Sequence, residues 1–202
     1  VEVIDEKTNV AIIYSVLHPD LGALKKALES NGQRSVSFLK PSVKSTELKD
    51  VDLLILYQPN SSFQEIYKYA DNTKISIFTI TGPKTDWRFL NKVQTNFTKK
   101  SYNQAEEISP ILNSGFPVFN ISDFSIFNFP PLESNLVEIT FQKKHEVLLS
   151  QQIRGVDINQ PLLAVYGEEN GTDGGRGAIL FGENIWKWRM QTFRNDQSFK
   201  NF

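Results

Sequence analysis

Apolar residues in the first half of the chain fall in short continuous runs, and each run is followed by a turn and a segment with helical spacing. The runs are Val10–Val16, Val51–Tyr57 and Lys74–Ile80, and none of them contains Gly or Pro. Short apolar runs of this kind are typical of strands that are buried on both faces of a parallel sheet. The sequence therefore predicts three parallel strands of one sheet.

The segment after the first run has the features of a helix start. His18 can act as the N-cap, Pro19 takes the first helical position, where its missing N–H costs nothing, and Asp20 complements the positive end of the helix dipole. Gly32 is the expected C-terminal stop. Apolar residues recur at helical spacing at Leu21, Leu24 and Leu28. This strand, turn and helix form one unit, which sets the α/β class.

The same alternation continues to residue 93. A fourth strand is expected at Ser35–Leu39, and helical spacing predicts helices over Phe63–Ala70 and Trp87–Val93. Strands that alternate with helices in this way pair in parallel through right-handed crossovers. We therefore expect a flavodoxin-like three-layer sandwich, with a mainly parallel central sheet, helices on both of its faces and a β-hairpin extension.

The second half of the chain predicts further strands and a last helix. The strands are Leu136–Phe141, Val147–Ile153, Pro161–Tyr166 and Gly177–Phe181. The glycine-rich residues 171–177 are followed by a strand and lack the Lys-Ser/Thr ending of a phosphate-binding loop, so we interpret them as a hairpin turn. The helix begins at Ile185, and Trp186 and Trp188 are expected to be largely buried.

An aromatic segment precedes these strands and follows neither the helical nor the strand period. Its aromatic residues are Phe116, Phe119, Phe124, Phe127 and Phe129, and prolines interrupt it. One interpretation is a long arm that packs over the sheet or its edge. The other is a surface that binds a partner, because exposed aromatic clusters mark interfaces.

Composition narrows the possible functions. The chain has 202 residues, about the length of one domain (1–202), with 22 basic and 23 acidic residues, so no net field would recruit nucleic acid. There is no Cys, which excludes a cysteine nucleophile. There are only two His, which gives no basis for predicting a metal site. No apolar stretch is long enough to span a bilayer. Because the chain starts at Val1 and ends without a closing turn, we expect a segment excised from a longer polypeptide.

Candidate polar residues follow the three apolar runs. Turns at the carboxyl ends of parallel strands line the ligand crevice of open α/β sheets. The residues expected there are His18, Asp20, Gln58, Thr81 and Gly82. They carry little fixed charge, so a neutral polar or carboxylate group is the expected ligand, and no glycine fingerprint predicts a nucleotide or flavin cofactor. Alternatively, these turns cap one another and the arm from Phe116 to Phe129 covers the crevice.

Several motifs resemble a known family. They are His18-Pro19-Asp20, Leu54–Pro59, Thr81–Asp86, Phe129–Leu132 and Gly182–Arg189. Together they resemble a class I glutamine amidotransferase-like domain, in the version found in membrane-anchored, von Willebrand factor A domain-containing proteins of Bacteroidetes-type bacteria. The resemblance implies a flavodoxin-like fold. It also implies that the domain lies outside the cytoplasmic membrane. Where true glutamine amidotransferases carry the nucleophilic Cys, this chain has the Thr81 region, so glutaminase activity is not expected.

Two functions remain open from the sequence. The first is a non-catalytic binding or structural domain of a cell-envelope protein, which would contact neighbouring domains of its parent or other envelope proteins. The second is a hydrolase that works without Cys, with Thr81 or a His18-activated water as the attacking group. The position of His18 distinguishes the two functions. A hydrolase needs His18 within hydrogen-bond reach of a hydroxyl or a held water, whereas a binding domain does not.

Overall fold

The computed structural model describes residues 7–121, 125–126, 128–167 and 176–195. Within these residues, nine strands form one sheet in the order β2-β1-β3-β4-β9-β8-β7-β5-β6. The strands are β1 Thr8–Tyr14, β2 Arg34–Leu39, β3 Leu53–Tyr57, β4 Ser76–Thr81, β5 Phe97–Leu112, β6 Leu132–Phe141, β7 His145–Ile153, β8 Val156–Tyr166 and β9 Gly177–Phe181. The α-helices are α1 Pro19–Leu28, α2 Gln64–Thr73, α3 Trp87–Val93 and α4 Ile185–Asn195.

The parallel half of the sheet contains the three strands that the apolar runs predict. β3 pairs in parallel with β1 on one side and with β4 on the other, which confirms the expected arrangement. β2 extends this half beyond β1, and β9 extends it beyond β4, again in parallel. The resulting order 2-1-3-4-9 follows the flavodoxin-like order, in which the chain reverses direction across the sheet between β1 and β3.

The other half of the sheet is antiparallel, so the expectation of a mainly parallel sheet is wrong. β8, β7, β5 and β6 follow β9 with antiparallel pairing throughout, and the sheet is therefore mixed. The largest addition is β5, a strand of 16 residues that the sequence did not predict. It pairs with β6 along most of its length and with β7 through its last residues.

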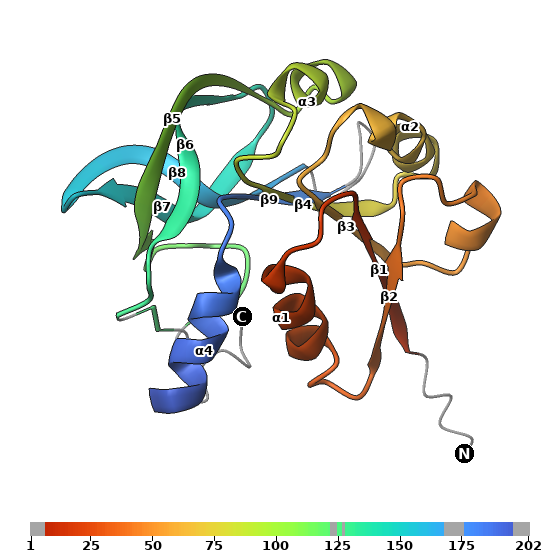
Figure 1. The fold of residues 1–202 in the computed structure, drawn as a ribbon, viewed down its shortest axis with the longest axis horizontal. Helices are drawn as coiled ribbons and strands as arrows, with labels where there is room; N and C mark the ends of the chain where they lie inside the picture. The colour runs from red at the N-terminus through yellow and green to blue at the C-terminus, as the bar shows by residue number, and fades with distance from the viewer. Residues whose placement is uncertain (1–6, 122–124, 127, 168–175, 196–202) are drawn as a thin grey trace.

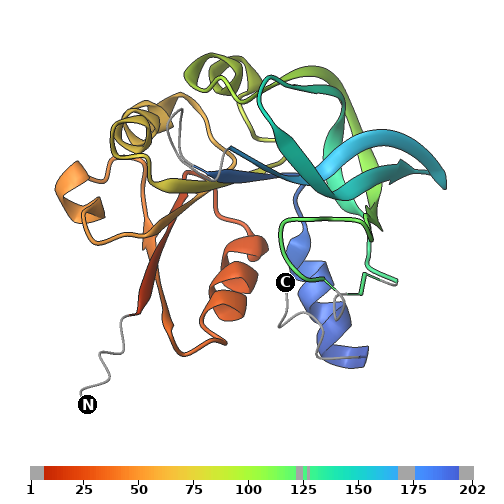
Figure 2. The ribbon, with the colours of Figure 1, turned by 180° about the vertical axis from the view of Figure 1, so that it is seen from behind.

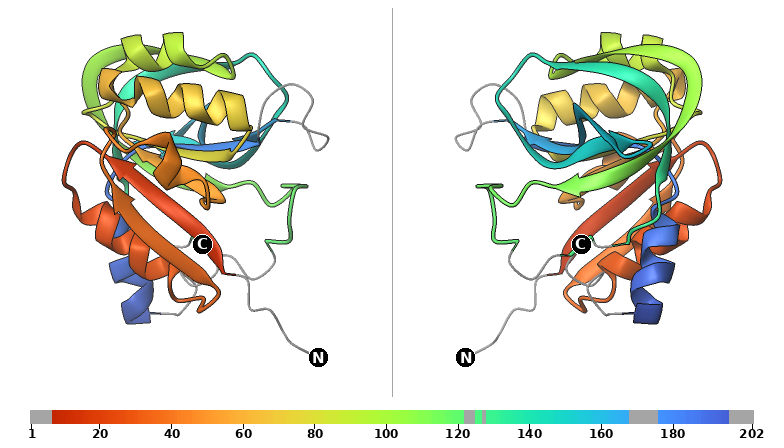
Figure 3. Two further views of the ribbon diagram at one scale, coloured as in Figure 1. Left: turned by 90° about the vertical axis from the view of Figure 1, so that its right-hand side faces the viewer. Right: turned by 90° about the vertical axis from the view of Figure 1, so that its left-hand side faces the viewer.

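Two helices cover each face of the sheet. Figure 1 shows α2 and α3 above the sheet and α1 and α4 below it, and the side views in Figure 3 show the sheet between these layers. The core runs through the sheet, where Ile12, Ile55 and Leu180 are at most 1% exposed. None of the helices in the described ranges is long and apolar enough to cross a bilayer.

The aromatic segment packs beside α4. Phe129 lies 5.1 Å from Trp188 between ring centroids, and the Trp188 indole N–H donates to the Pro130 carbonyl at 2.6 Å. Trp188 is fully buried, whereas Trp186 is half-buried. Figure 2 shows the described part of this segment, in green, next to α4. The end of the arm at Phe129 and Pro130 therefore covers α4, while Phe116 is buried in the core. Phe124 and Phe127 lie outside the described residues.

Several predicted boundaries differ from the structure. β1 begins at Thr8 and ends at Tyr14, two residues earlier than expected, and α1 ends at Leu28, with Glu29 rather than Gly32 as its C-cap. The predicted hairpin turn at 171–177 lies almost entirely outside the described residues. Tyr166 of β8 pairs with Gly177 of β9 in antiparallel register on either side of it.

Candidate functional site

His18 stands at the junction of β1 and α1 and caps the helix, as the sequence predicts. Its backbone is extended, and its Nδ1 atom accepts the Asp20 backbone N–H at 3.2 Å. Because Nδ1 acts as an acceptor, the proton of the neutral ring is on Nε2. The ring also stacks on Tyr57, with 5.7 Å between ring centroids. Capping and stacking together hold the imidazole in one orientation, with Nε2 on its opposite side.

Asp20 is fully buried and its carboxylate is occupied by three donors. It accepts the Tyr57 hydroxyl at 3.0 Å, the Asn184 backbone N–H at 2.8 Å and the Trp186 backbone N–H at 2.9 Å. The last two are N–H groups at the start of α4, which have no partners within the helix itself. Asp20 therefore joins α1, β3 and α4 at the carboxyl edge of the sheet, and its oxygens serve the fold.

Gln58 follows β3 directly and is fully buried. Its φ of 48° lies in the left-handed region, and its backbone N–H donates to the Ile80 carbonyl at 2.7 Å. The side-chain carbonyl accepts the Lys84 backbone N–H at 2.9 Å, while the amide N–H donates to the Glu183 carboxylate. Both ends of the amide are therefore engaged, so Gln58 fixes the turn after β4 and the position of Glu183.

Gly82 makes room for this contact. A Cβ atom at this position would lie 2.8 Å from the Gln58 amide and 2.8 Å from a Glu183 carboxylate oxygen. Real Cβ atoms do not come so close, so a side chain at this position would displace the Gln58 amide or the Glu183 carboxylate. The Gly82 backbone N–H donates to the Thr85 hydroxyl at 2.9 Å within the same turn.

Thr81 does not present its hydroxyl to a ligand. The residue is fully buried, and its Oγ1 donates to the Leu180 carbonyl of β9 at 3.1 Å. Turns of the edge also bind each other, since the Asn60 side chain donates to the Ser15 hydroxyl at 3.0 Å. This mutual capping is one part of the alternative that the sequence left open.

Glu183 is the central residue of the site, and sequence reasoning missed it. It follows β9, whose carboxyl end meets the same edge as those of β1, β3 and β4. Its backbone exchanges two hydrogen bonds with Glu133, at 2.9 and 3.1 Å. Its carboxylate lies 3.9 Å from His18 Nε2, and the two side chains are 14% and 17% exposed. His18 and Glu183 thus form the partly exposed polar pair of this edge.

The electrostatics of the pair follow from its surroundings. Burial raises the pKa of the Glu183 carboxyl, while His18 and Gln58 oppose this rise. The nearby carboxylates of Glu133 and Asp20 add to it. Burial also raises the pKa of the Tyr57 hydroxyl, so that Tyr57 is a neutral donor to Asp20.

The chemistry available to the site is limited. It offers an imidazole N–H and a carboxylate side by side, which can donate to and accept from one polar group of a ligand. Within the described residues, no three His, Asp or Glu side chains converge in a way that could hold a metal ion.

Solved structures resemble this fold at low sequence identity. A putative GMP synthase component from Thermoplasma acidophilum superposes with a TM-score of 0.51 at 12% identity, covering 96% of this chain and 93% of its own. An exo-β-1,4-mannosidase from Opitutaceae bacterium strain TAV5 gives a TM-score of 0.56 at 10% identity. That match covers 96% of this chain but only 35% of the mannosidase. The sequence itself matches no protein-family model and no curated protein.

These likenesses concern the fold. The GMP synthase component supports the class I glutamine amidotransferase-like architecture, since nearly the whole of both chains superposes. The present chain spans about a third of the mannosidase, so it resembles one part of that protein. Function depends on the residues placed on a fold, and at these identities nothing about activity transfers.

Proposed function

We propose that this chain is a non-catalytic binding domain with a glutamine amidotransferase-like fold. The proposal rests on the position of the Thr81 hydroxyl, which is buried and donates to the Leu180 carbonyl. It is the hydroxyl nearest in sequence to the position of the amidotransferase nucleophile, and the chain contains no Cys. A nucleophile must be exposed to substrate and paired with a base. Thr81 meets neither requirement in this arrangement.

The binding group in this proposal is the pair formed by His18 and Glu183. Both side chains are partly exposed, and both are held in place by buried partners, Tyr57 for the ring and Gln58 for the carboxylate. Pre-oriented polar groups bind at a lower entropic cost than mobile ones. The proposed ligand is a polar group with both a donor and an acceptor, supplied by a neighbouring domain of the parent protein.

An ammonia-release assay tests the absence of catalysis. We expect no ammonia release from glutamine above the buffer blank, because the nucleophile that this chemistry requires is missing. Turnover that is lost in Thr81→Val would overturn the proposal.

Binding is tested by NMR of the histidine ring on addition of the neighbouring domain of the parent protein. The signals of His18 should shift, whereas those of the exposed His145 should not. In Glu183→Gln the shift should weaken. Unchanged His18 signals at saturating concentrations of the neighbouring domain would count against the pair as the binding group.

A second candidate function rests on the same two residues. A carboxyl group with a raised pKa beside an imidazole can move protons to and from a water molecule, as general acid–base catalysis requires. A hydrolase of this kind would cleave an activated ester such as p-nitrophenyl acetate. Its activity would fall in both His18→Ala and Glu183→Gln, which is the result that would favour it over the binding domain.

We further propose a cell-envelope setting, which comes from the sequence resemblance alone. In this setting the domain belongs to a membrane-anchored protein of the von Willebrand factor A domain-containing type and lies outside the cytoplasmic membrane. Fractionation of cells that express the full-length parent tests it. Recovery of the domain in the cytosolic fraction, protected from protease added outside the membrane, would contradict the proposal.

A further inference from the structure

Asn31 and Gly32 lie in the exposed turn between α1 and β2. α1 ends at Leu28 and β2 begins at Arg34, so this dipeptide belongs to neither element. In an asparagine–glycine dipeptide the backbone nitrogen of the glycine can attack the side-chain amide of the asparagine, because glycine has no Cβ that would hinder the approach. His18 caps the opposite end of α1, so the turn is remote from the pair discussed above.

The Asn31 side chain folds over the backbone of its own turn. Its Oδ1 atom accepts the Gln33 backbone N–H at 3.0 Å, which forms an Asx turn. This hydrogen bond closes a ring that holds the amide carbon Cγ close to the Gly32 nitrogen. The Gln33 N–H also donates to the oxygen on which negative charge develops during an attack at Cγ. The turn therefore brings the two reacting atoms together and stabilises the charge that the attack creates.

The reacting groups are open to solvent. Asn31, Gly32 and Gln33 are all exposed. Water and base can therefore reach the Gly32 N–H, which must lose its proton before the nitrogen can attack. A Cβ atom on Gly32 would meet nothing within 4 Å, and the backbone of Gly32 is not in the left-handed region. An alanine would thus fit the turn, and it would differ from glycine only by hindering the attack.

The amide nitrogen of Asn31, which would leave as ammonia, is not held. Among the described residues, none accepts a hydrogen bond from its Nδ2 atom. Asn60 and Asn113 form the same kind of turn, in which Oδ1 accepts the N–H two residues later at 3.0 and 3.1 Å. Their Nδ2 atoms, however, donate to the Ser15 hydroxyl at 3.0 Å and to the Val147 carbonyl at 2.9 Å. Each is also followed by a serine, whose Cβ hinders attack.

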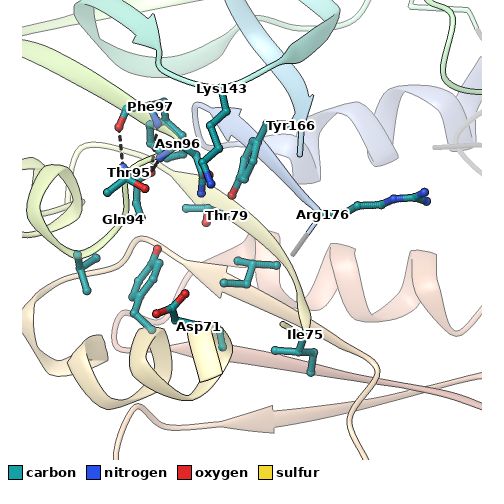
Figure 4. A pocket seen from close by; sticks show the side chains of 14 residues that line it. Asp71, Ile75, Thr79, Gln94, Thr95, Asn96, Phe97, Lys143, Tyr166 and Arg176 are labelled. Atoms are coloured by element: carbon teal, nitrogen blue, oxygen red, sulfur yellow. Dashed lines mark hydrogen bonds between the residues drawn. The ribbon is translucent and has the colours of Figure 1, made fainter. Parts of the chain in front are cut away.

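Gln94 shows a side-chain amide that is held at both atoms. Its oxygen accepts the N–H groups of Asn96 and Phe97 at 2.8 and 3.2 Å. Its nitrogen donates to the carbonyls of Leu90 and Phe97 at 3.2 and 2.7 Å. Figure 4 looks into the pocket beside this turn and shows the amide next to the backbone of Asn96 and Phe97. Such an amide must break hydrogen bonds to lose its nitrogen, whereas the Asn31 amide is bound through its oxygen alone.

We propose that Asn31 is a site of spontaneous deamidation and isoaspartate formation. The Gly32 nitrogen forms a bond to Cγ of Asn31, the Cγ–Nδ2 bond breaks, and the nitrogen leaves as ammonia with the proton that Gly32 loses. Water then opens the five-membered succinimide. Hydrolysis at Cγ gives aspartate, and hydrolysis at the main-chain carbonyl gives isoaspartate, whose backbone passes through Cβ and Cγ. This site does not depend on the function proposed for His18 and Glu183.

The modification changes the start of β2. Both products add a carboxylate to the turn, and isoaspartate also lengthens the main chain by one atom. The Asn31 carbonyl accepts the Arg34 N–H at 3.0 Å, and the Gln33 carbonyl accepts the Thr8 N–H at 2.9 Å. These two bonds join the turn to the first residues of β2 and β1, so a longer turn weakens the pairing at this end of the two strands.

Peptide mapping of the full chain tests the proposal. The folded protein is kept at pH 8, and samples taken over time are digested with trypsin, which releases residues 27–34 as one peptide. We expect this peptide to gain one dalton and to separate into aspartate and isoaspartate forms, which electron-transfer fragmentation locates at Asn31. The peptides that contain Asn60 and Asn113 should stay unchanged over the same period. Hydrogen exchange at Thr8 and Arg34 should be faster in the converted protein.

Gly32→Ala is the matched variant, because it adds one carbon in open space and leaves the fold intact. Its peptide should convert about tenfold more slowly than that of the wild type, which corresponds to about 1.4 kcal/mol in the activation barrier. Equal rates in the variant and the wild type would overturn the attack by Gly32. Conversion of Asn31 in urea-unfolded protein alone would overturn the role of the folded turn. A gain confined to Asn170, which also precedes a glycine and lies outside the described residues, would overturn the assignment to Asn31.

Discussion

The Asp20 carboxylate accepts the Trp186 backbone N–H at 2.9 Å and so joins two residues that are 166 positions apart in the chain. The same group also binds the Asn184 N–H, so the start of α1 supplies the cap for the start of α4. α1 and α4 pack side by side on one face of the sheet (Figure 1). One buried carboxylate therefore fixes both helices against the edge that carries His18 and Glu183.

Asp20→Asn should destabilise the protein by about 2–4 kcal/mol, because an amide in place of the carboxylate leaves buried donors without an acceptor. Urea unfolding followed by circular dichroism measures the change. Asp50→Asn, at an exposed position, is the control and should change the free energy of unfolding by less than about 0.5 kcal/mol. Equal stability of the two variants would show that the Asp20 network contributes little.

The local parts of this arrangement could be predicted from the sequence. His18 caps α1 because a capping side chain, a proline and an acidic residue follow one another, and this signal needs no knowledge of the rest of the fold. The strands β1, β3 and β4 were visible because each is a run of apolar residues that both faces of the sheet bury. Gln58 and Gly82 could be placed at the carboxyl edge because they directly follow β3 and β4.

The distant contacts could not be predicted in the same way. Glu183 joins the site only because β9 pairs in parallel with β4, about 100 residues earlier in the chain, and its apolar run shows no preference for that partner. β5 escaped prediction because charged residues such as Lys99, Lys100 and Glu107 break the apolar pattern. One of these, Lys99, is nevertheless buried, although its charge would place it on the solvent-exposed side of the strand.

Trp188→Ala should cost about 3–5 kcal/mol of unfolding free energy. Trp188 is fully buried, packs on Phe129 and donates to the Pro130 carbonyl, so its loss removes both a large apolar area and the contact between α4 and the arm. Trp186→Ala, at a half-buried position two residues away, should cost clearly less. Thermal unfolding of the two variants measures the difference, and a larger loss for Trp186→Ala would be inconsistent with this packing.

Gly82→Ala should destabilise the protein by about 1–3 kcal/mol, because the added carbon overlaps the Gln58 amide and the Glu183 carboxylate. Gly22→Ala is its matched control. Gly22 lies within α1 with nothing within 4 Å of a new Cβ, so the same substitution should stabilise by about 0.5–1 kcal/mol. Chemical denaturation should therefore give changes of opposite sign, and two changes of the same sign would contradict the close approach at Gly82.

Lys99 predicts a pH dependence of stability. Its side chain is 3% exposed, and its Nζ lies 4.1 Å from the centroid of the Trp87 ring. Burial lowers the pKa of Lys99 from 10.5 to about 7. Between pH 7 and pH 10 the unfolded chain therefore holds a proton that the folded protein has released. Stability rises with pH wherever the unfolded state binds more protons, so this residue penalises folding fully below pH 7 and progressively less above it.

Lys99→Met removes this titration while keeping an unbranched side chain beside Trp87. The difference in unfolding free energy between variant and wild type should be largest below pH 7, in favour of the variant. This difference should then shrink by at most about 1.4 kcal/mol per pH unit toward pH 10.

Lys100→Met is the control, because the Lys100 side chain is 77% exposed and pairs with Glu138 at 3.5 Å. The difference in unfolding free energy between Lys100→Met and the wild type should stay nearly constant with pH. Urea titrations at pH 6, 7, 8 and 9 measure both series. If the Lys99→Met difference is as flat as that of the control, the Lys99 amine keeps an ordinary pKa and is not buried against Trp87 in solution.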